Sequence, residues 1–114
     1  MNLEKVIQQL FKNNFMVYKE KIKKIEGEKN VEIFVFTLST CGWCRRAKDL
    51  LDNLGVEYSY IDVDLLDEED MKEVEDILEK FNSDGFPTII IDNTNVLQGF
   101  DEDKLKRALQ NGKN

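Results

Sequence analysis

Residues 31–54 read VEIFVFTLSTCGWCRRAKDLLDNL and contain two patterns in succession. Residues 31–37 are mostly β-branched or aromatic, which predicts a strand buried on both faces. After Cys41, apolar residues recur at helical spacing, and Gly55 follows where a helix C-cap is expected. The stretch therefore predicts a central parallel strand followed by a helix, with the sequence CGWC where the helix begins.

The chain beyond this stretch continues to alternate between strand and helix patterns. Residues 56–63 predict a second strand, and residues 66–81 predict a strongly acidic amphipathic helix with Asp67 as its N-cap. Residues 87–91, which begin with the only proline, and residues 96–98 predict a hairpin. A last helix completes the order β-α-β-α-β-β-α, which is an α/β arrangement.

The N-terminal segment has a pattern of its own. Apolar residues fall near helical spacing over residues 1–25, with Lys and Gln between them, at Leu3, Ile7, Leu10, Val17, Ile22 and Ile25. This spacing predicts an amphipathic helix, and the region of Gly27 then marks a boundary. We therefore expect an N-terminal helical extension at residues 1–30 and one α/β domain at residues 31–114.

The charge of the chain limits its partners. Its 114 residues carry a formal charge of −7, and residues 31–114 hold nine Lys and Arg against nineteen Asp and Glu. Such a surface repels nucleic acids and anionic membranes, so neither is an expected partner. The N-terminal stretch is interrupted by charges, and no run of about 18 apolar residues occurs, which argues against a secretory signal and a membrane span. We therefore expect the protein in the cytoplasm.

The only cysteines, Cys41 and Cys44, stand at the start of the helix predicted after residue 41, and the chain has no histidine. Two thiols at this spacing can form a disulfide across one helical turn, which predicts redox chemistry. The free N–H groups and the dipole at a helix start stabilise a thiolate, and Arg45 and Arg46 add positive charge nearby. Cys41 is therefore the expected nucleophile, and Cys44 is the expected resolving thiol.

Metal binding is an alternative interpretation of the two cysteines. A structural zinc site needs about four ligands, and this chain has no second cysteine pair, so no zinc site within one chain is expected. An iron–sulfur cluster that bridges two chains stays open as an alternative. The two Cys41 thiolates and two external thiolates would then supply four sulfur ligands.

Several segments together resemble a glutaredoxin of the thioredoxin superfamily over about residues 31–110. They are CGWC after an apolar strand, the continuation RRAKDLLDNLGVEYSYIDVD, Gly85-Phe86-Pro87-Thr88 and Gln98-Gly99-Phe100-Asp101. The resemblance implies a thioredoxin-like fold with a four-stranded mixed sheet, in strand order 2-1-3-4, flanked by helices. It also implies that Cys41 attacks and Cys44 resolves, that no cofactor is required, and that glutathione is a possible electron donor.

The resemblance further implies contacts with the substrate. Pro87 matches the cis-proline of the family, although a trans proline that begins an edge strand is the alternative. Phe86 matches the residue whose backbone pairs with a bound peptide or glutathione. The N-terminus of the last helix suits the carboxylate at the γ-glutamyl end of glutathione, although a glycine turn and an Asp N-cap explain the same residues. Trp43 either contacts a docking partner or packs within the domain. The expected substrate-binding residues are Trp43, Phe86, Pro87, Thr88, Gly99, Phe100 and Asp101.

The sequence departs from glutaredoxins where the electron donor matters. Leu38 stands where glutaredoxins usually have Lys or Arg, and Gln98-Gly99 replaces a double glycine. Residues 99–105 instead resemble redoxins that are recharged by thioredoxin reductase. We therefore expect a dithiol–disulfide oxidoreductase that reduces protein disulfides and is recharged by glutathione or by a thioredoxin-reductase-type enzyme.

Overall fold

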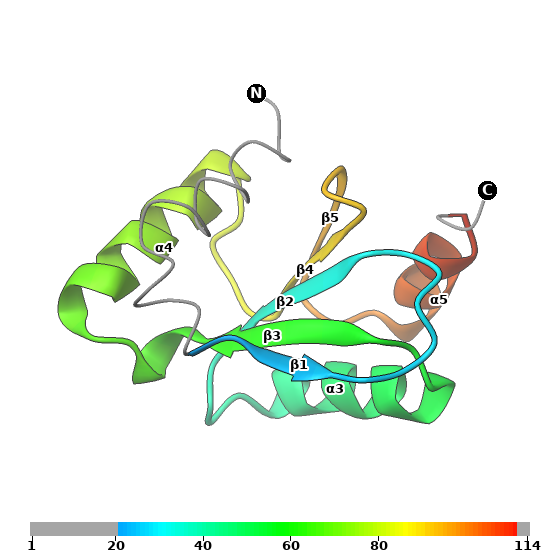
Figure 1. Cartoon of the computed structure of the whole chain (residues 1–114). Coiled ribbons are helices and arrows are strands. Elements are labelled where there is room, and N and C mark those ends of the chain that lie inside the picture. Colours follow the sequence, from blue (N-terminus) through cyan, green and yellow to red (C-terminus); the bar gives the residue numbers. More distant parts are fainter. Residues whose placement is uncertain (1–20, 112–114) are drawn as a thin grey trace.

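A computed structural model describes residues 21–111 (Figure 1). From residue 33 onward, the strands and α-helices follow the predicted order β-α-β-α-β-β-α. The elements are β1 (Lys23–Ile25), β2 (Ile33–Thr37), α3 (Gly42–Leu54), β3 (Tyr58–Asp62), the 3-10 turn η1 (Val63–Leu65), α4 (Glu68–Lys80), β4 (Thr88–Ile91), β5 (Asn95–Gln98) and α5 (Glu102–Asn111). No helix in this part of the chain is long and apolar enough to span a membrane.

The strands form one mixed sheet in the order β1-β3-β2-β4-β5. Strands β2 and β3 are parallel, and every other neighbouring pair is antiparallel. The order β3-β2-β4-β5 is the expected 2-1-3-4 arrangement, which is confirmed. The expected number of four strands is wrong, because β1 adds a fifth strand beside β3.

Strand β1 also corrects the helix predicted at the N-terminus. Its residues Lys23 and Ile25 pair with Tyr60 and Tyr58, so backbone pairing replaces the helix expected up to residue 25. The Ile25 side chain packs against the sheet, whereas both lysines of β1 are exposed. Residues 1–20 of the predicted helix lie outside the described residues, and the domain boundary at residue 30 stays a prediction.

A close backbone contact follows β1. Gly27 lies so near to residues 55–57 that a Cβ atom there would stand 2.6 Å from the carbonyl carbon of Val56. The Glu28 N–H donates to the Gly55 carbonyl at 2.8 Å, and the Glu57 N–H donates to the Glu28 carbonyl at 2.9 Å. Only glycine fits this approach without a backbone shift, which explains the glycine at position 27.

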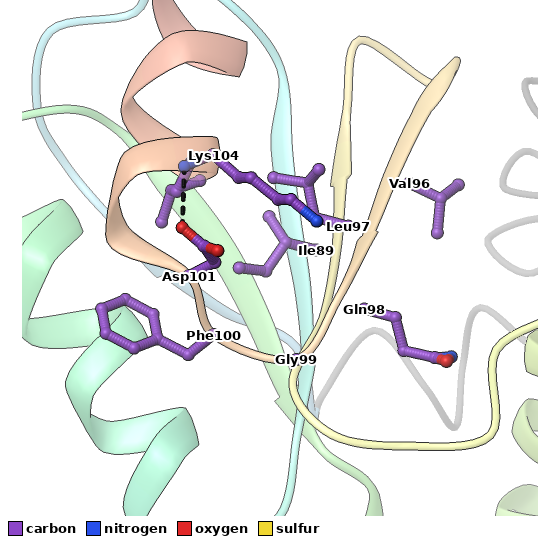
Figure 2. Close-up of a pocket in the computed structure, with 9 residues that line it drawn as sticks. Ile89, Val96, Leu97, Gln98, Gly99, Phe100, Asp101 and Lys104 are labelled. Carbon is purple, nitrogen blue, oxygen red and sulfur yellow. Dashed lines mark hydrogen bonds between the residues drawn. The ribbon is translucent and has the colours of Figure 1, made fainter.

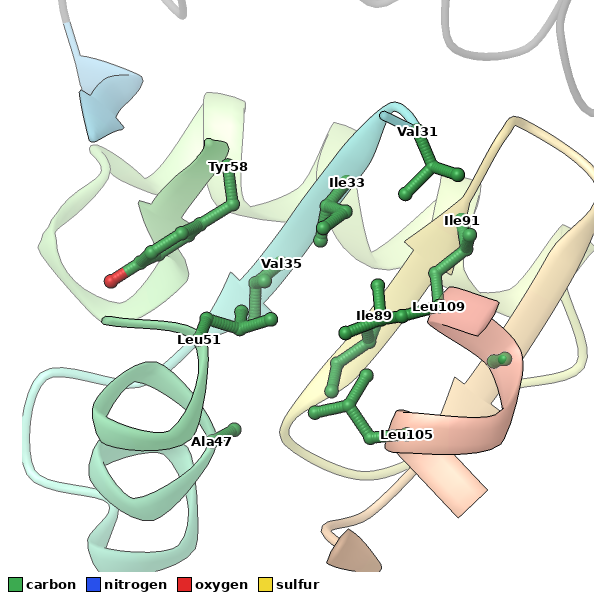
Figure 3. Packing of buried hydrophobic residues seen from close by; sticks show 11 residues of the cluster. Val31, Ile33, Val35, Ala47, Leu51, Tyr58, Ile89, Ile91, Leu105 and Leu109 are labelled. Carbon is green, nitrogen blue, oxygen red and sulfur yellow. The ribbon is translucent and has the colours of Figure 1, made fainter. Parts of the chain in front are cut away.

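Helices cover both faces of the sheet and bury β2 completely. Phe34 and Phe36 point into the cluster packed under α4, whereas Ile33 and Val35 point into the cluster packed under α3 and α5. Figure 3 shows this second cluster, with side chains of α3 and α5 meeting those of β2 and β4. Burial on both faces accounts for the continuous apolar run of β2.

The helix ends agree with the caps expected from the sequence. Asp67 accepts a hydrogen bond from the Asp70 N–H at 2.9 Å and begins α4. Gly55 ends α3 in the left-handed conformation, with a φ of 71°. Asp67 thus marks the start of α4, and Gly55 marks the end of α3. The N-cap of α3 is Cys41 itself.

Candidate active site

The candidate site lies at one edge of the sheet, where several chain segments converge. Strands β2 and β3 are parallel, so the loop after Thr37 and the turn after Asp62 emerge at the same edge. Strand β4 runs antiparallel to β2, and Thr88 pairs with Phe36, which brings Pro87 to this edge as well. The topology therefore brings the loop that leads to Cys41 to the same edge as Pro87.

Cys41 is the N-cap residue of α3. Its Sγ accepts a hydrogen bond from the Cys44 N–H at 3.1 Å, and its backbone carbonyl accepts from the Arg45 N–H at 3.1 Å. The sulfur thus lies where the first N–H groups of the helix point, which is a position suited to a nucleophile. The side chain is partly exposed and is not in a disulfide, so an incoming sulfur atom can reach it.

Cys44 has a very different environment one turn along α3. Its side chain is only 1% exposed. The pKa of the Cys44 thiol is raised from 9.0 to about 12, chiefly by burial and also by the hydrogen bond and charge of Cys41. The Leu38 backbone and the Lys48 charge act in the opposite direction without cancelling it. At neutral pH, Cys44 is therefore a protonated thiol.

A carboxylate that the sequence reasoning missed holds the loop before Cys41. The Ser39 N–H donates to Asp64 Oδ1 at 2.7 Å, and the Ser39 hydroxyl donates to the other carboxylate oxygen. Ser39 follows β2 and Asp64 follows β3, so each lies just beyond the carboxyl end of a parallel strand. Polar residues at such ends are a signal that could have identified this contact.

Trp43 stacks on Phe100 at the surface. The ring centroids are 6.4 Å apart with 30° between the ring planes, and Trp43 remains 57% exposed. The Arg46 guanidinium carbon lies 5.0 Å from the centroid of the Trp43 ring. An aromatic pair contributes about 0.5–1.5 kcal/mol beyond its buried area, and an exposed cation–π contact contributes about 0.5–1 kcal/mol. The stack connects the start of α3 to the loop before α5.

The proline loop has the expected conformation. The Phe86–Pro87 peptide bond is cis. The Thr88 hydroxyl is buried, donates to the Gly85 carbonyl at 2.7 Å and bonds the Ser83 hydroxyl at 2.5 Å. The Gly99 N–H donates to the Pro87 carbonyl at 2.8 Å, so this loop is joined to the one that carries Phe100. Phe86 packs in part against the α4-side cluster.

Asp101 caps the last helix and borders a pocket. Its Oδ1 accepts the Lys104 N–H at 3.1 Å, which is the N-cap expected for an Asp at this position. Gly99, Phe100 and Asp101 line part of a pocket of about 430 Å³ between β5 and α5. In Figure 2, the Lys104 side chain extends across this pocket toward Leu97, whereas the Phe100 ring lies on the side of α3.

A family model described as Glutaredoxin matches residues 33–96. The chain belongs to the glutaredoxin family. This glutaredoxin is 30% identical over 78 residues to an uncharacterized glutaredoxin-like 8.6 kDa protein in a rubredoxin operon of Clostridium pasteurianum, covering 68% of the chain and 97% of that relative.

Solved structures of glutaredoxins and of a related redoxin have a similar fold. Methanoredoxin from Methanosarcina acetivorans is 37% identical with a TM-score of 0.70, covering 76% of this glutaredoxin and 94% of the methanoredoxin. The glutaredoxin from Archaeoglobus fulgidus is 30% identical with a TM-score of 0.64, covering 70% of this chain and 87% of its own. The fold is therefore thioredoxin-like, and these relatives place the protein among the thiol–disulfide redoxins.

Proposed function

We propose that this glutaredoxin reduces disulfide bonds in other proteins, with Cys41 as the attacking thiolate and Cys44 as the resolving thiol. The observation that carries the proposal is the difference between the two thiols. Cys41 is accessible and accepts an N–H hydrogen bond at a helix start, whereas Cys44 is buried and its pKa is raised to about 12. In such a pair, one thiol is suited to attack the substrate, and the other stays protonated until it resolves the mixed disulfide.

The proposed first step forms a mixed disulfide. The Cys41 thiolate attacks one sulfur of the substrate disulfide, the S–S bond breaks, and the other substrate sulfur leaves as a thiolate that takes a proton from water. Cys44 then loses its proton and attacks Cys41 Sγ, which releases the second substrate sulfur as a thiolate. The Cys41–Cys44 dithiol has been oxidised to a disulfide, and two electrons have reduced the substrate.

The electrostatics of Cys44 support this order of events. The hydrogen bond and charge of Cys41 are among the causes that raise the Cys44 pKa. Once Cys41 is part of a mixed disulfide it carries no charge, so these contributions end and only the burial of Cys44 still opposes ionisation. The attack by Cys41 therefore makes the second thiol easier to deprotonate at the moment when it is needed.

The proposed substrate site consists of the residues around Cys41. Trp43 supplies exposed apolar surface beside the half-buried Phe100, while Phe86, Pro87 and Thr88 form the segment whose backbone would pair with an extended peptide. Gly99 and Asp101 would meet the γ-glutamyl end of glutathione if glutathione binds. The protein would act in the cytoplasm, where the thiols stay reduced, and needs no resident cofactor for these steps.

The disulfide form must receive two electrons from a donor. The proposed donor is a thioredoxin-reductase-type enzyme, with glutathione as the weaker alternative. Leu38 packs in part against the α4-side cluster and provides no cation for a glutathione carboxylate. An extended protein segment relies less on that charge, because backbone pairing at Phe86 is available to it.

One coupled assay tests the function and the donor together. NADPH oxidation is followed with a protein disulfide as substrate, once with thioredoxin reductase and once with glutathione plus glutathione reductase. We expect turnover that depends on this protein and is faster with thioredoxin reductase. Absence of turnover with both donors and with dithiothreitol, together with slow iodoacetamide labelling of Cys41 at neutral pH, would overturn the proposal. An absorbance spectrum after anaerobic purification tests the iron–sulfur alternative.

A further inference from the structure

The most exposed aromatic ring near the reactive thiol is that of Trp43, the second residue of α3. Although the ring contacts Phe100, it remains 57% exposed. The large exposed hydrophobic side chains among the described residues are Trp43, Leu54 and Leu65. Trp43 lies two positions after Cys41, so a molecule bound to the thiol also meets this ring.

Arg46 gives the same surface a positive charge in a defined place. Its guanidinium group lies over the Trp43 ring, one helical turn further along α3. Neither Arg45 nor Arg46 takes part in any of the ion pairs of residues 21–111. Within residues 21–111, the Arg46 guanidinium therefore forms no ion pair with a carboxylate, and its contact with the ring holds the group in position.

The charge around Cys41 differs from that of the rest of the domain. The first turn of α3 contains no acidic residue, whereas the first turns of α4 and α5 contain Glu68, Glu69 and Asp70, and Glu102 and Asp103. The domain as a whole has a large excess of carboxylates. Arg46 and Trp43 thus form a cationic and aromatic patch next to the nucleophile, flanked by Asp64 beyond Ser39 and by Asp101 after Phe100.

We propose that Trp43, Arg46 and Phe100 form a docking surface for a polypeptide segment that carries an Asp or Glu side chain close to the cysteine under attack. The inference rests on the proposed function, because it concerns the substrate of the same thiol. Charge complementarity selects the carboxylate, and the exposed ring requires apolar or backbone surface over it. A protein segment supplies both, whereas a tripeptide thiol such as glutathione leaves most of the ring uncovered.

The spacing between Cys41 and Arg46 limits the position of the acidic side chain in the substrate. Arg46 lies five residues after Cys41, so its Cα atom is about 7.5 Å further along the helix at about 1.5 Å per residue. Its guanidinium reaches back over Trp43, so about 7.5 Å is the upper limit along the helix. An extended peptide advances about 3.3 Å per residue, so this distance spans two or three residues of substrate. The expected acidic side chain therefore lies two or three positions from the attacked cysteine.

The test uses two peptide substrates that differ at one position. Both carry the same mixed disulfide with thionitrobenzoate, and one has Glu while the other has Gln two residues from the cysteine. The rate of thionitrobenzoate release by the full-length protein gives kcat/KM for each peptide. We expect the Glu peptide to react about three- to fivefold faster at low salt, and this preference to shrink at about 0.5 M salt as screening increases.

Three variants show which residue is responsible for the preference for the Glu peptide. Arg46→Gln should bring the Glu-to-Gln ratio close to one. Lys80→Gln removes one positive charge from the end of α4, on the helix that packs on the opposite face of the sheet, and should keep the ratio of the unmodified protein. Trp43→Ala should lower kcat/KM for both peptides, because both use the ring.

Each outcome bears on one of the two proposals. Equal rates with the Glu and Gln peptides, an unchanged ratio in Arg46→Gln, or faster reaction with a glutathione mixed disulfide than with the Glu peptide would overturn the docking surface. Turnover of both peptides at equal rates would still leave the disulfide chemistry intact. No reaction with either peptide or with a small aromatic disulfide would instead overturn the proposed function.

Discussion

The Ser39 N–H donates to the Asp64 carboxylate at 2.7 Å, and the Ser39 hydroxyl donates to the second oxygen of the same group. One side chain thus accepts two hydrogen bonds from a residue two positions before Cys41. These bonds hold the pKa of Asp64 below its usual value of 3.8. The loop that presents the nucleophile is therefore attached to the turn after β3 by a carboxylate that must be ionised to accept both bonds fully.

Replacing Asp64 with Asn should lower the free energy of unfolding at pH 7 by about 1 kcal/mol, because a charge-assisted hydrogen bond to Ser39 is lost at an exposed site. Folding lowers the pKa of Asp64, so its contribution is present above pH 4 or so and is lost as pH falls through the folded-state pKa. Urea unfolding at pH 7 and pH 3 measures this. The difference between the two proteins should shrink at pH 3; a constant difference would show that ionisation of Asp64 is not involved.

Cys41→Ser should abolish reduction of a protein disulfide, whereas Cys44→Ser should still form the mixed disulfide and keep it. The reason is that only Cys41 is accessible, while Cys44 is needed to release the substrate. Non-reducing gel electrophoresis and mass spectrometry detect the trapped complex. Faster alkylation of Cys44 than of Cys41 in the reduced protein would mean that the two roles are reversed.

Cys41→Ala should lower the pKa of Cys44 from about 12, because the hydrogen bond and charge of Cys41 that raise it are removed. The pKa should stay above the ordinary 9.0, since burial is the largest cause. Thiolate absorbance near 240 nm reports the titration, and the same variant unfolded in urea is the control. Because folding raises the pKa of Cys44, the free energy of unfolding should fall as pH rises above the pKa of Cys44 in the unfolded state. A folded-state pKa equal to that in urea would contradict the burial argument.

Leu38→Lys should raise activity toward a glutathione mixed disulfide by about tenfold or more, because a charge-assisted hydrogen bond contributes on the order of 1.5–3 kcal/mol. Reduction of a protein disulfide should change little. Leu54→Lys, at the far end of α3 where Leu54 is 42% exposed, adds the same charge away from the site. Equal gains for both substrates, or a similar gain from Leu54→Lys, would show that position 38 does not contact glutathione.

Gly27→Ala should reduce the free energy of unfolding by about 1–3 kcal/mol, the usual cost of overpacking. The new Cβ would lie 2.6 Å from the Val56 carbonyl carbon and 2.7 Å from the Gly55 oxygen, so the backbone must move. Gly42→Ala is the matched control for stability, because no atom lies within 4 Å of a Cβ there. Urea or thermal unfolding compares the variants, and equal stability of both would refute the close approach at Gly27.

Local patterns were sufficient to predict the parts of the fold that local chemistry determines. The continuous apolar run of β2 indicated a strand buried on both faces, and Asp67 and Gly55 were predicted as helix caps. Cys41 was expected at the start of a helix because the apolar spacing changes immediately after it. The cis peptide before Pro87 and the strand order came from the resemblance to glutaredoxins, not from composition or spacing.

Contacts between distant segments were not predicted from these local patterns. Strand β1 contains two exposed lysines, so its sequence suggests a helix surface as readily as a strand, and only pairing with Tyr58 and Tyr60 determines the outcome. The Trp43–Phe100 stack and the Ser39–Asp64 contact each join residues from different loops. Neither depends on a local propensity, and therefore neither was predicted.

The extra strand β1 has a consequence for how copies of this protein behave at high concentration. Without it, β3 would present unpaired N–H and carbonyl groups along five residues, which is a template for pairing with another chain. With it, the outer position is taken by three residues that include Lys23 and Lys24, both exposed. A short strand with adjacent lysines is a poor partner for a second copy, because like charges would face each other across the new pair. Strand β1 thus protects this side of the sheet against association between molecules.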